Sequence, residues 1–142
     1  MDTDTSPKPP SVTVFESDER PFGQIVTAGH HVVGSDEPER LGGHDTGMSP
    51  YELLLAALGA CTSMTIRMYA DRKQWPLSHV SVALRHVRGT GAAGPPIDRF
   101  ERRISLQGDL TEEQRQHRLE IAEKCPVSQT LSRPSRVDSS LA

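Results

Sequence analysis

Cysteine is scarce in this sequence, and the two cysteines that occur are far apart. Cys61 and Cys125 are the only cysteines in 142 residues, and neither belongs to a C-x-x-C pair. Zinc ribbons and thioredoxin-like redox sites use such pairs, so neither kind of site is expected. In a reducing compartment a permanent disulfide is not expected, whereas a transient one between two thiols can form.

Long apolar runs and clusters of positive charge are also missing. The longest apolar run, residues 53–57 with its neighbours, is interrupted by Gly59, Thr62 and Ser63, and we predict that it does not span a membrane. The net charge is -3 and the basic residues are dispersed, which gives no reason to expect a nucleic-acid partner. No apolar run follows the first charges, so no secretory signal is predicted. A cytoplasmic protein is the resulting expectation.

Apolar residues make up only 35% of the chain, and part of this deficit lies at its ends. Residues 1–10, MDTDTSPKPP, are polar and show no repeating apolar pattern, which predicts a disordered N-terminal arm. The remaining residues, 11–142, are enough for a single domain with its own hydrophobic core.

Alternating apolar side chains predict three short strands before the middle of the chain. These strands are expected at residues 11–16, 24–28 and 31–34, and the last two should form a hairpin around Gly29. Glycine and charged residues dominate residues 35–47, which predicts a mobile loop.

The strongest signal in the sequence is the start of a long helix. Ser49, Pro50 and Glu52 form the pattern of an N-cap, a first-turn proline and a capping-box glutamate, so a helix is predicted over 51–73. Its first half is apolar on every side, and such a helix is expected to be buried all round. One small sheet covers only one side of a helix, so a second helix or a partner subunit must cover the rest.

The residues after this helix show a strand pattern and then a second helix signal. Strict alternation predicts strands over 80–88 and 97–107, which should pair antiparallel. Thr111 and Gln114 have the spacing of another capping box, which predicts a helix over 112–124.

The end of this second helix is marked by a proline. Cys125 precedes Pro126, and a residue before proline avoids the helical region. A short last strand is expected near Arg136. The order of strands and helices, with hairpin connections, predicts an α+β fold of antiparallel sheets around the long buried helix.

Both cysteines have a functional interpretation and a structural one. Cys61, in the middle of the long helix, is either a small buried hydrophobe or a nucleophile. Cys125 is either a core residue or a thiol whose pKa is lowered by the start of a short helix at Pro126. Two thiols that meet in space can reduce a peroxide, because one becomes a sulfenic acid and the other condenses with it to a disulfide.

Two segments together resemble the OsmC/Ohr family. SPYELLLAALGACTSMTIRMYADRKQWPL, which contains Cys61, is similar to the central helix of that family, and EIAEKCPVSQTL, which contains Cys125, is similar to its second-cysteine motif. The resemblance extends over about residues 11–131. It implies an intertwined homodimer with the two long helices at its centre and the sites at the interface.

The resemblance also implies an activity. That activity is the thiol-dependent reduction of organic hydroperoxides in defence against oxidative stress, with a dithiol reductant as the recycling partner and with neither a metal nor a bound cofactor. By this resemblance Cys61 is the peroxidatic thiol and Cys125 is the resolving thiol.

The sequence departs from the family around the first cysteine. Family members with peroxidase activity carry a glutamate ten residues before that cysteine, paired with an arginine, but this position is Tyr51 here. Glu52 stands nine residues before Cys61, and nine steps of about 100° place it on the opposite side of a straight helix. Glu52 and Arg20 are the candidate supporting residues, and Arg40 is a further candidate for the activating charge.

Other hypotheses stay open at this point. The chain could be a non-catalytic dimeric module that binds a small ligand or a partner, with structural or redox-sensing cysteines, or a structural companion to a separate enzyme. The peroxidase hypothesis predicts a partly accessible Cys61 of low pKa close to Cys125. The binding-module hypothesis predicts a fully packed Cys61 with no arginine nearby.

No metal site is expected in this chain. His30 and His31 are neighbours in the sequence, and adjacent side chains of a strand point to opposite faces, so they should not bind one ion together.

Overall fold

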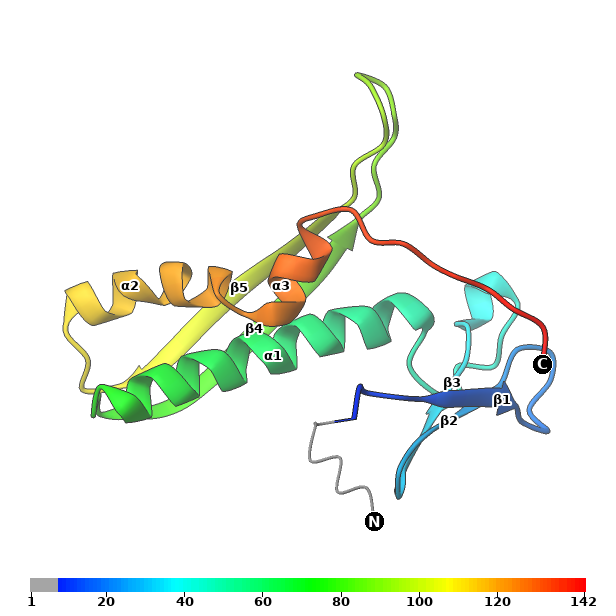
Figure 1. Cartoon of the computed structure of the whole chain (residues 1–142), viewed down its shortest axis with the longest axis horizontal. Coiled ribbons are helices and arrows are strands. Elements are labelled where there is room, and N and C mark those ends of the chain that lie inside the picture. Colours follow the sequence, from blue (N-terminus) through cyan, green and yellow to red (C-terminus); the bar gives the residue numbers. More distant parts are fainter. Residues whose placement is uncertain (1–7) are drawn as a thin grey trace, which may run out of the picture. The chain divides into compact units, whose positions relative to one another are not determined.

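The computed structural model describes residues 8–142, which form parts of two compact units, Met1–Leu53 and Leu54–Ala142 (Figure 1). Most of the predicted N-terminal arm, residues 1–7, lies outside the described residues. The single domain predicted over 11–142 stays a prediction.

The first unit contains a three-stranded antiparallel sheet. Its strands are β1 (Thr13–Glu16), β2 (Gln24–Ala28) and β3 (His31–Ser35), in the order β1-β2-β3. The β2–β3 hairpin turns at Gly29, whose φ of 60° is a conformation that glycine adopts without strain. The three strands and the hairpin predicted from the alternation of side chains are confirmed.

The segment after β3 is organised around a buried carboxylate. Asp36 accepts hydrogen bonds from the N–H of Glu37 at 2.7 Å, from the N–H of His44 at 3.2 Å, and from the hydroxyl of Thr46 at 2.8 Å. A short 3-10 helix, η1 (Glu39–Leu41), lies inside this segment. The predicted loop over 35–47 is present, and its conformation is held by one side chain that satisfies several backbone donors at once.

The long helix α1 (Pro50–Arg72) begins where the capping signal predicted. The Ser49 hydroxyl accepts the N–H of Glu52 at 3.3 Å, as expected for an N-cap serine. Only one stripe of the helix is buried in this chain, and it consists of Leu58, Gly59, Thr62, Ile66 and Ala70. Met64 is 65% exposed and Met68 is 63% exposed, so the chain by itself does not bury the helix on all sides.

The second unit packs this stripe against a hairpin and a second helix. Strands β4 (Leu77–Val87) and β5 (Arg99–Gly108) pair antiparallel, and α2 (Glu112–Glu123) and the short α3 (Pro126–Leu131) follow (Figure 1). The core residues come from α1, both strands and α2, and they are Ile66, Ala70, Leu77, Ile104, Ile121 and Ala122. The predicted α+β class with antiparallel sheets and a long central helix is confirmed.

The second capping box is complete, whereas the last predicted strand is absent. Thr111 accepts the N–H of Gln114 at 3.1 Å, and the Gln114 side chain accepts the N–H of Thr111 at 2.9 Å. Within the described residues, 133–142 contain neither helix nor strand. The strand expected near Arg136 is therefore wrong, because that exposed segment pairs with no other strand.

The length of α1 corrects one expectation. Among residues 8–142, α1 is the one helix whose length and composition would allow it to cross a membrane. The argument that its apolar run is too short therefore does not hold. The packing of its buried stripe against the hairpin and α2 is also typical of a core helix in a globular protein.

Candidate active site

The two cysteines lie on different elements of the second unit. Cys61 is partly exposed in the middle of α1, and Cys125 is fully buried at the N-cap of α3, directly after α2. Pro126 occupies the first position of α3, where its missing N–H leaves no donor unpaired. The predicted short helix after Cys125 thus places this sulfur at a helix N-terminus.

The fold brings these two thiols into contact. Each cysteine shifts the pKa of the other, which requires the two thiols to lie close together, and both cysteines are free. The residues are 64 positions apart (125 minus 61), so the contact depends on α3 packing against α1. The proximity of Cys61 to Cys125, which a redox pair requires, is present.

The electrostatics favour a negative charge on Cys125. Burial opposes the charge, but hydrogen bonds from the Cys61 thiol, the backbone N–H of Ser128 and the hydroxyl of Thr62 hold the pKa of Cys125 below its ordinary value. The N–H of Val127 acts in the same direction. The backbone N–H groups in the first turn of α3 therefore lower the pKa of Cys125. This is the effect that was predicted for a thiol at the start of a helix.

Cys61 shows the opposite behaviour. Burial and the hydrogen bond to Cys125 raise the pKa of Cys61, and the donors from Val127 and Thr65 offset this only in part. The expectation of a low pKa at Cys61 is therefore wrong for this chain. The physical reason is that a proton shared between two sulfurs stays with the one that has fewer donors around it.

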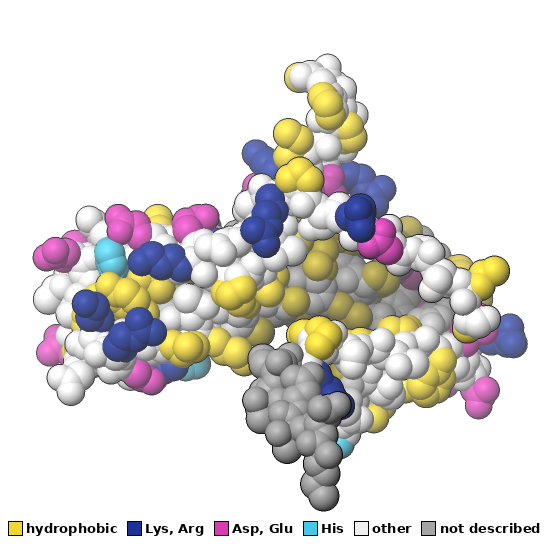
Figure 2. Space-filling view, viewed as in Figure 1, with side chains coloured by type: hydrophobic (Ala, Val, Ile, Leu, Met, Phe, Trp, Pro, Cys, Tyr) yellow, Lys and Arg dark blue, Asp and Glu magenta, His cyan; other side chains and the backbone are white. Residues whose placement is uncertain are grey.

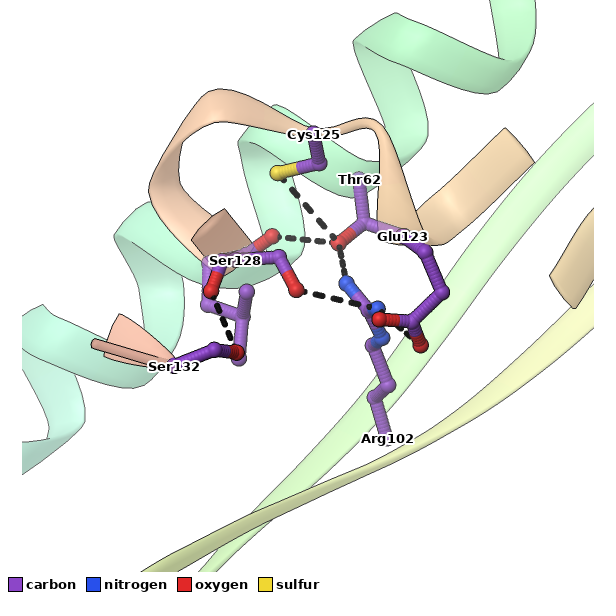
Figure 3. Close-up of polar contacts among 7 residues, drawn as sticks. Thr62, Arg102, Glu123, Cys125, Ser128 and Ser132 are labelled. Carbon is purple, nitrogen blue, oxygen red and sulfur yellow. Dashed lines mark hydrogen bonds and ion pairs between the residues drawn. The ribbon is translucent and has the colours of Figure 1, made fainter. Parts of the chain in front are cut away.

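An arginine that sequence analysis missed lies next to the hydroxyls that surround Cys125 (Figure 3). Arg102 on β5 donates from Nη1 to the Thr62 hydroxyl at 2.9 Å and from Nη2 to the Ser128 hydroxyl at 3.2 Å. Nη2 also forms an ion pair with Glu123 at 3.2 Å. Thr62 Oγ1 lies 4.0 Å from the sulfur of Cys125.

The sequence did contain a signal for this arginine. Phe100, Arg102, Ile104 and Leu106 share one face of β5, and the side chain of Arg102 is only 12% exposed. A cation on the inward face of an alternating strand needs buried partners, and Thr62 on the buried stripe of α1 is one of them.

The predicted supporting residues belong to the other unit. Arg20 is exposed in the turn between β1 and β2, and its N–H donates to the carbonyl of Asp18. Glu52 lies in the first turn of α1, where its N–H is bound by Ser49. None of the hydrogen bonds described above around the two thiols involves Arg20 or Glu52.

The histidine pair corrects a further argument. The rings of His30 and His31 lie 4.1 Å apart, because His30 is in the turn and not in the strand. The expectation that they point to opposite faces is therefore wrong. Within residues 8–142, no group of three or more metal-binding side chains comes together.

Two pockets are lined by residues next to the thiol pair, and neither cysteine lines either of them. One, of about 420 Å³, is lined on the β5 side by Leu58, Ile97, Asp98, Phe100, Arg102, Leu119, Glu123, Ser128, Leu131 and Ser132. The other, of about 340 Å³, lies beyond Cys61 along α1 and is lined by Thr65, Met68, Tyr69, Arg72, Ile121, Lys124 and Pro126. The second pocket contains Thr65, whose hydroxyl lowers the pKa of Cys61, and Pro126, which follows Cys125.

Comparison with known proteins identifies the fold. A family model described as OsmC-like protein matches residues 43–140. An OsmC-like protein from Mycoplasma pneumoniae is similar in structure, with a TM-score of 0.72, 16% identity and 88% of each chain covered. An organic hydroperoxide resistance protein OsmC from Legionella pneumophila gives 0.67 and 20% identity, covering 87% of this chain and 89% of the other.

A third similar structure is an organic hydroperoxide resistance protein from Elizabethkingia anophelis. Its TM-score is 0.64 at 21% identity, with 84% of this chain and 86% of the other covered. No curated protein matches the chain. At such identities the solved structures show a shared fold, and the chemistry must be argued from this chain's own residues.

Proposed function

The chain belongs to the OsmC-like protein family, and we propose that it reduces organic hydroperoxides through the thiols of Cys61 and Cys125. The observation that supports this most directly is the proximity of the partly exposed Cys61 to the buried Cys125, whose surroundings lower its pKa and so favour the thiolate. The names of the structures from Legionella pneumophila and Elizabethkingia anophelis, both organic hydroperoxide resistance proteins, point to the same substrate class.

The first chemical step takes place at Cys61, the less buried of the two cysteines. Cys61 passes its proton to the Cys125 thiolate as its sulfur attacks the outer oxygen of the peroxide. An S–O bond forms and the O–O bond breaks, which leaves a sulfenic acid on Cys61 and an alkoxide. The alkoxide takes the proton from Cys125 and departs as the alcohol, so Cys125 is a thiolate again.

The second step takes place at Cys125. Its thiolate attacks the sulfenic sulfur of Cys61, the S–S bond forms, and the S–O bond breaks with release of hydroxide. Together the two sulfurs lose two electrons, and the two peroxide oxygens gain them as alcohol and hydroxide. A dithiol reductant then restores both thiols by thiol–disulfide exchange and is itself oxidised to a disulfide.

The pocket beyond Cys61 suits the organic part of such a substrate. Met68, Ile121 and Pro126 supply apolar walls, and the pocket of about 340 Å³ is within the size of small-molecule sites. Apolar side chains also lie at the surface along α1 (Figure 2). We propose that a second copy of the chain covers this face in a homodimer, since exposed Met64 and Met68 otherwise remain in water.

The non-catalytic alternative rests on two observations. Burial raises the pKa of Cys61, and Tyr51 stands where active family members carry a glutamate, so the attacking thiol lacks that support. In this alternative the same pocket and dimer bind a ligand or partner, and the two cysteines sense redox state or only pack. A cytoplasmic location and a role in oxidative-stress defence go with the peroxidase proposal.

The decisive experiment is a free-thiol count and an intact mass before and after one equivalent of an organic hydroperoxide. The peroxidase proposal expects both thiols to disappear with the loss of two hydrogens and one molecule of alcohol to form. Cys61→Ser should abolish peroxide consumption, whereas Cys125→Ser, which also lacks the proton acceptor of the first step, should consume no more than one equivalent at a lower rate and leave a sulfenic acid that a dione reagent traps. If both thiols of the unaltered chain persist under excess peroxide, the peroxidase proposal is refuted and the binding module is favoured.

A further inference from the structure

We propose that Arg102 is the positioning residue of the thiol pair. Its guanidinium holds Thr62 and Ser128 against the sulfur of Cys125, so the reduced pair carries its thiolate on Cys125 (Figure 3). The inference rests on the proposed function, because it treats the two cysteines as a reacting pair. It assigns to β5 the supporting role that was expected of Arg20 and Glu52.

Two paths of contacts lead from the guanidinium of Arg102 to the sulfur of Cys125, like the two arms of a fork. One arm runs from Nη1 of Arg102 through the Thr62 hydroxyl, 2.9 Å away, to the Cys125 sulfur a further 4.0 Å on. The other runs from Nη2 to the Ser128 hydroxyl at 3.2 Å, and the N–H of Ser128 donates to the same sulfur. Arg102 thereby links β5 to α1 and to the first turn of α3.

The hydroxyl of Thr62 has one proton to donate and two possible acceptors for it. It can donate to the carbonyl of Leu58 at 2.7 Å or turn toward Cys125 at 4.0 Å. Because Arg102 donates to the oxygen of Thr62, the proton is left to these two acceptors. A thiolate is the stronger acceptor, so ionisation of Cys125 draws the proton toward the sulfur.

The positive charge of Arg102 is mostly shielded from water, so it affects the buried groups around Cys125 more than an exposed charge would. Its side chain is 12% exposed, whereas that of its ion-pair partner Glu123 is 74% exposed and largely screened by water. The titratable and charged groups that face Cys125 are Cys61 from α1, Arg102 from β5, and Glu123 and Lys124 from the end of α2. Lys124 places its ammonium over the ring of Tyr69, so Arg102 is the cation bound to the site's hydroxyls.

The size of the effect follows from the distance. The guanidinium and the Cys125 sulfur are joined by contacts of 2.9 Å and 4.0 Å, so they lie no more than about 7 Å apart. Coulomb's law at an effective dielectric of about 20 then gives a pKa effect of at most about one to two units, which the ion pair of Arg102 with Glu123 reduces. Lysine would keep the charge but could not bind two hydroxyls in a planar fork, so it should retain only part of the effect.

The test is a titration of Cys125 alone, in a Cys61→Ser background, followed by the ultraviolet absorbance of the thiolate as pH rises. No peroxide is present, so the result is independent of the proposed function. Arg102→Gln should raise the pKa of Cys125 by at most about one to two units, and Arg102→Lys by less. The control is Arg103→Gln, which removes the same charge from the exposed face of the same strand and should leave the titration unchanged.

A second variant covers the case in which Arg102→Gln fails to fold. Thr62→Val keeps the charge and the shape but removes one arm of the fork, and it should also raise the pKa of Cys125. Unchanged titrations in folded Arg102→Gln or in Thr62→Val overturn the inference. If the unaltered chain leaves peroxide intact but Arg102→Gln shifts the titration, the proposed function fails and the inference about charge stands.

Discussion

Gly59 sets how closely α1 approaches the hairpin, and its replacement by alanine should have opposite effects in two backgrounds. A Cβ at Gly59 would lie 2.6 Å from Cδ1 of Leu84, whereas carbon atoms in contact prefer about 3.5 to 4.0 Å. Leu84 would have to move by about 1 Å, and overpacking of this kind costs about 1–3 kcal/mol. Alanine in place of glycine gains about 1 kcal/mol in a helix, which is smaller than most of that range.

We therefore expect Gly59→Ala to lower the free energy of unfolding of the otherwise unaltered chain by about 1 kcal/mol. With Leu84→Ala the obstructing methyl groups are gone, and the same change should then raise stability by about 1 kcal/mol. The sign reversal is the prediction. It can be measured as a double-mutant cycle by urea unfolding at one fixed protein concentration, because dimer formation would make stability depend on concentration.

Ala60→Gly provides the matched control. Ala60 is exposed next to Gly59 in the same helix, so this change measures the helix-propensity contribution by itself and should cost about 1 kcal/mol. If Gly59→Ala stabilises the unaltered chain by the full propensity difference, Leu84 has room to move and the reasoning is refuted. Leu84 pairs with Arg102 across the hairpin, so the same close approach brings Thr62 within reach of that arginine.

Two further predictions concern the ends of elements. Thr111→Ala removes the N-cap of α2 and should lower the free energy of unfolding by about 1 kcal/mol in urea, whereas Ser140→Ala in the exposed tail should change nothing. Burial opposes ionisation of Asp36, but hydrogen bonds led by the hydroxyl of Thr46 hold the pKa of Asp36 below its usual value. Its folded pKa lies below its unfolded one, so its stabilising contribution is present above the unfolded pKa of about 3.9 and is lost as pH falls through the folded value. Asp36→Asn should weaken the fall in stability below about pH 4, and an unchanged acid limb of urea midpoints would contradict this role.

The parts of the fold that the sequence predicted are those with strong local chemistry. Ser49 with Pro50, and Thr111 with Gln114, mark helix starts by satisfying backbone donors within one turn, so neither depends on distant contacts. The alternation of apolar and polar side chains that predicts a strand is likewise a local feature of the sequence. The strand expected near Arg136 had no such support, since a strand exists only through pairing with another.

The candidate site shows where local reasoning ends. The position of Cys125 before Pro126 predicted donors around its sulfur, and the first turn of α3 supplies them. The role of Arg102 could not be predicted, because alternation gives the face of a side chain but not what lies opposite it. Only the packing of α1 and α3 on β5 brings Thr62 and Ser128 to its two nitrogens.

The separation of the two cysteines along the chain ties redox chemistry to folding. A bond between Cys61 and Cys125 would close a loop of 64 residues (125 minus 61), which removes about 4 kcal/mol of conformational freedom from the unfolded chain. The same free energy makes the pair easier to oxidise in the folded protein than in an unfolded copy, by about a thousandfold. A chain that has lost its fold would therefore also lose most of its tendency to form this disulfide. Reductant would then be consumed almost entirely by correctly folded molecules.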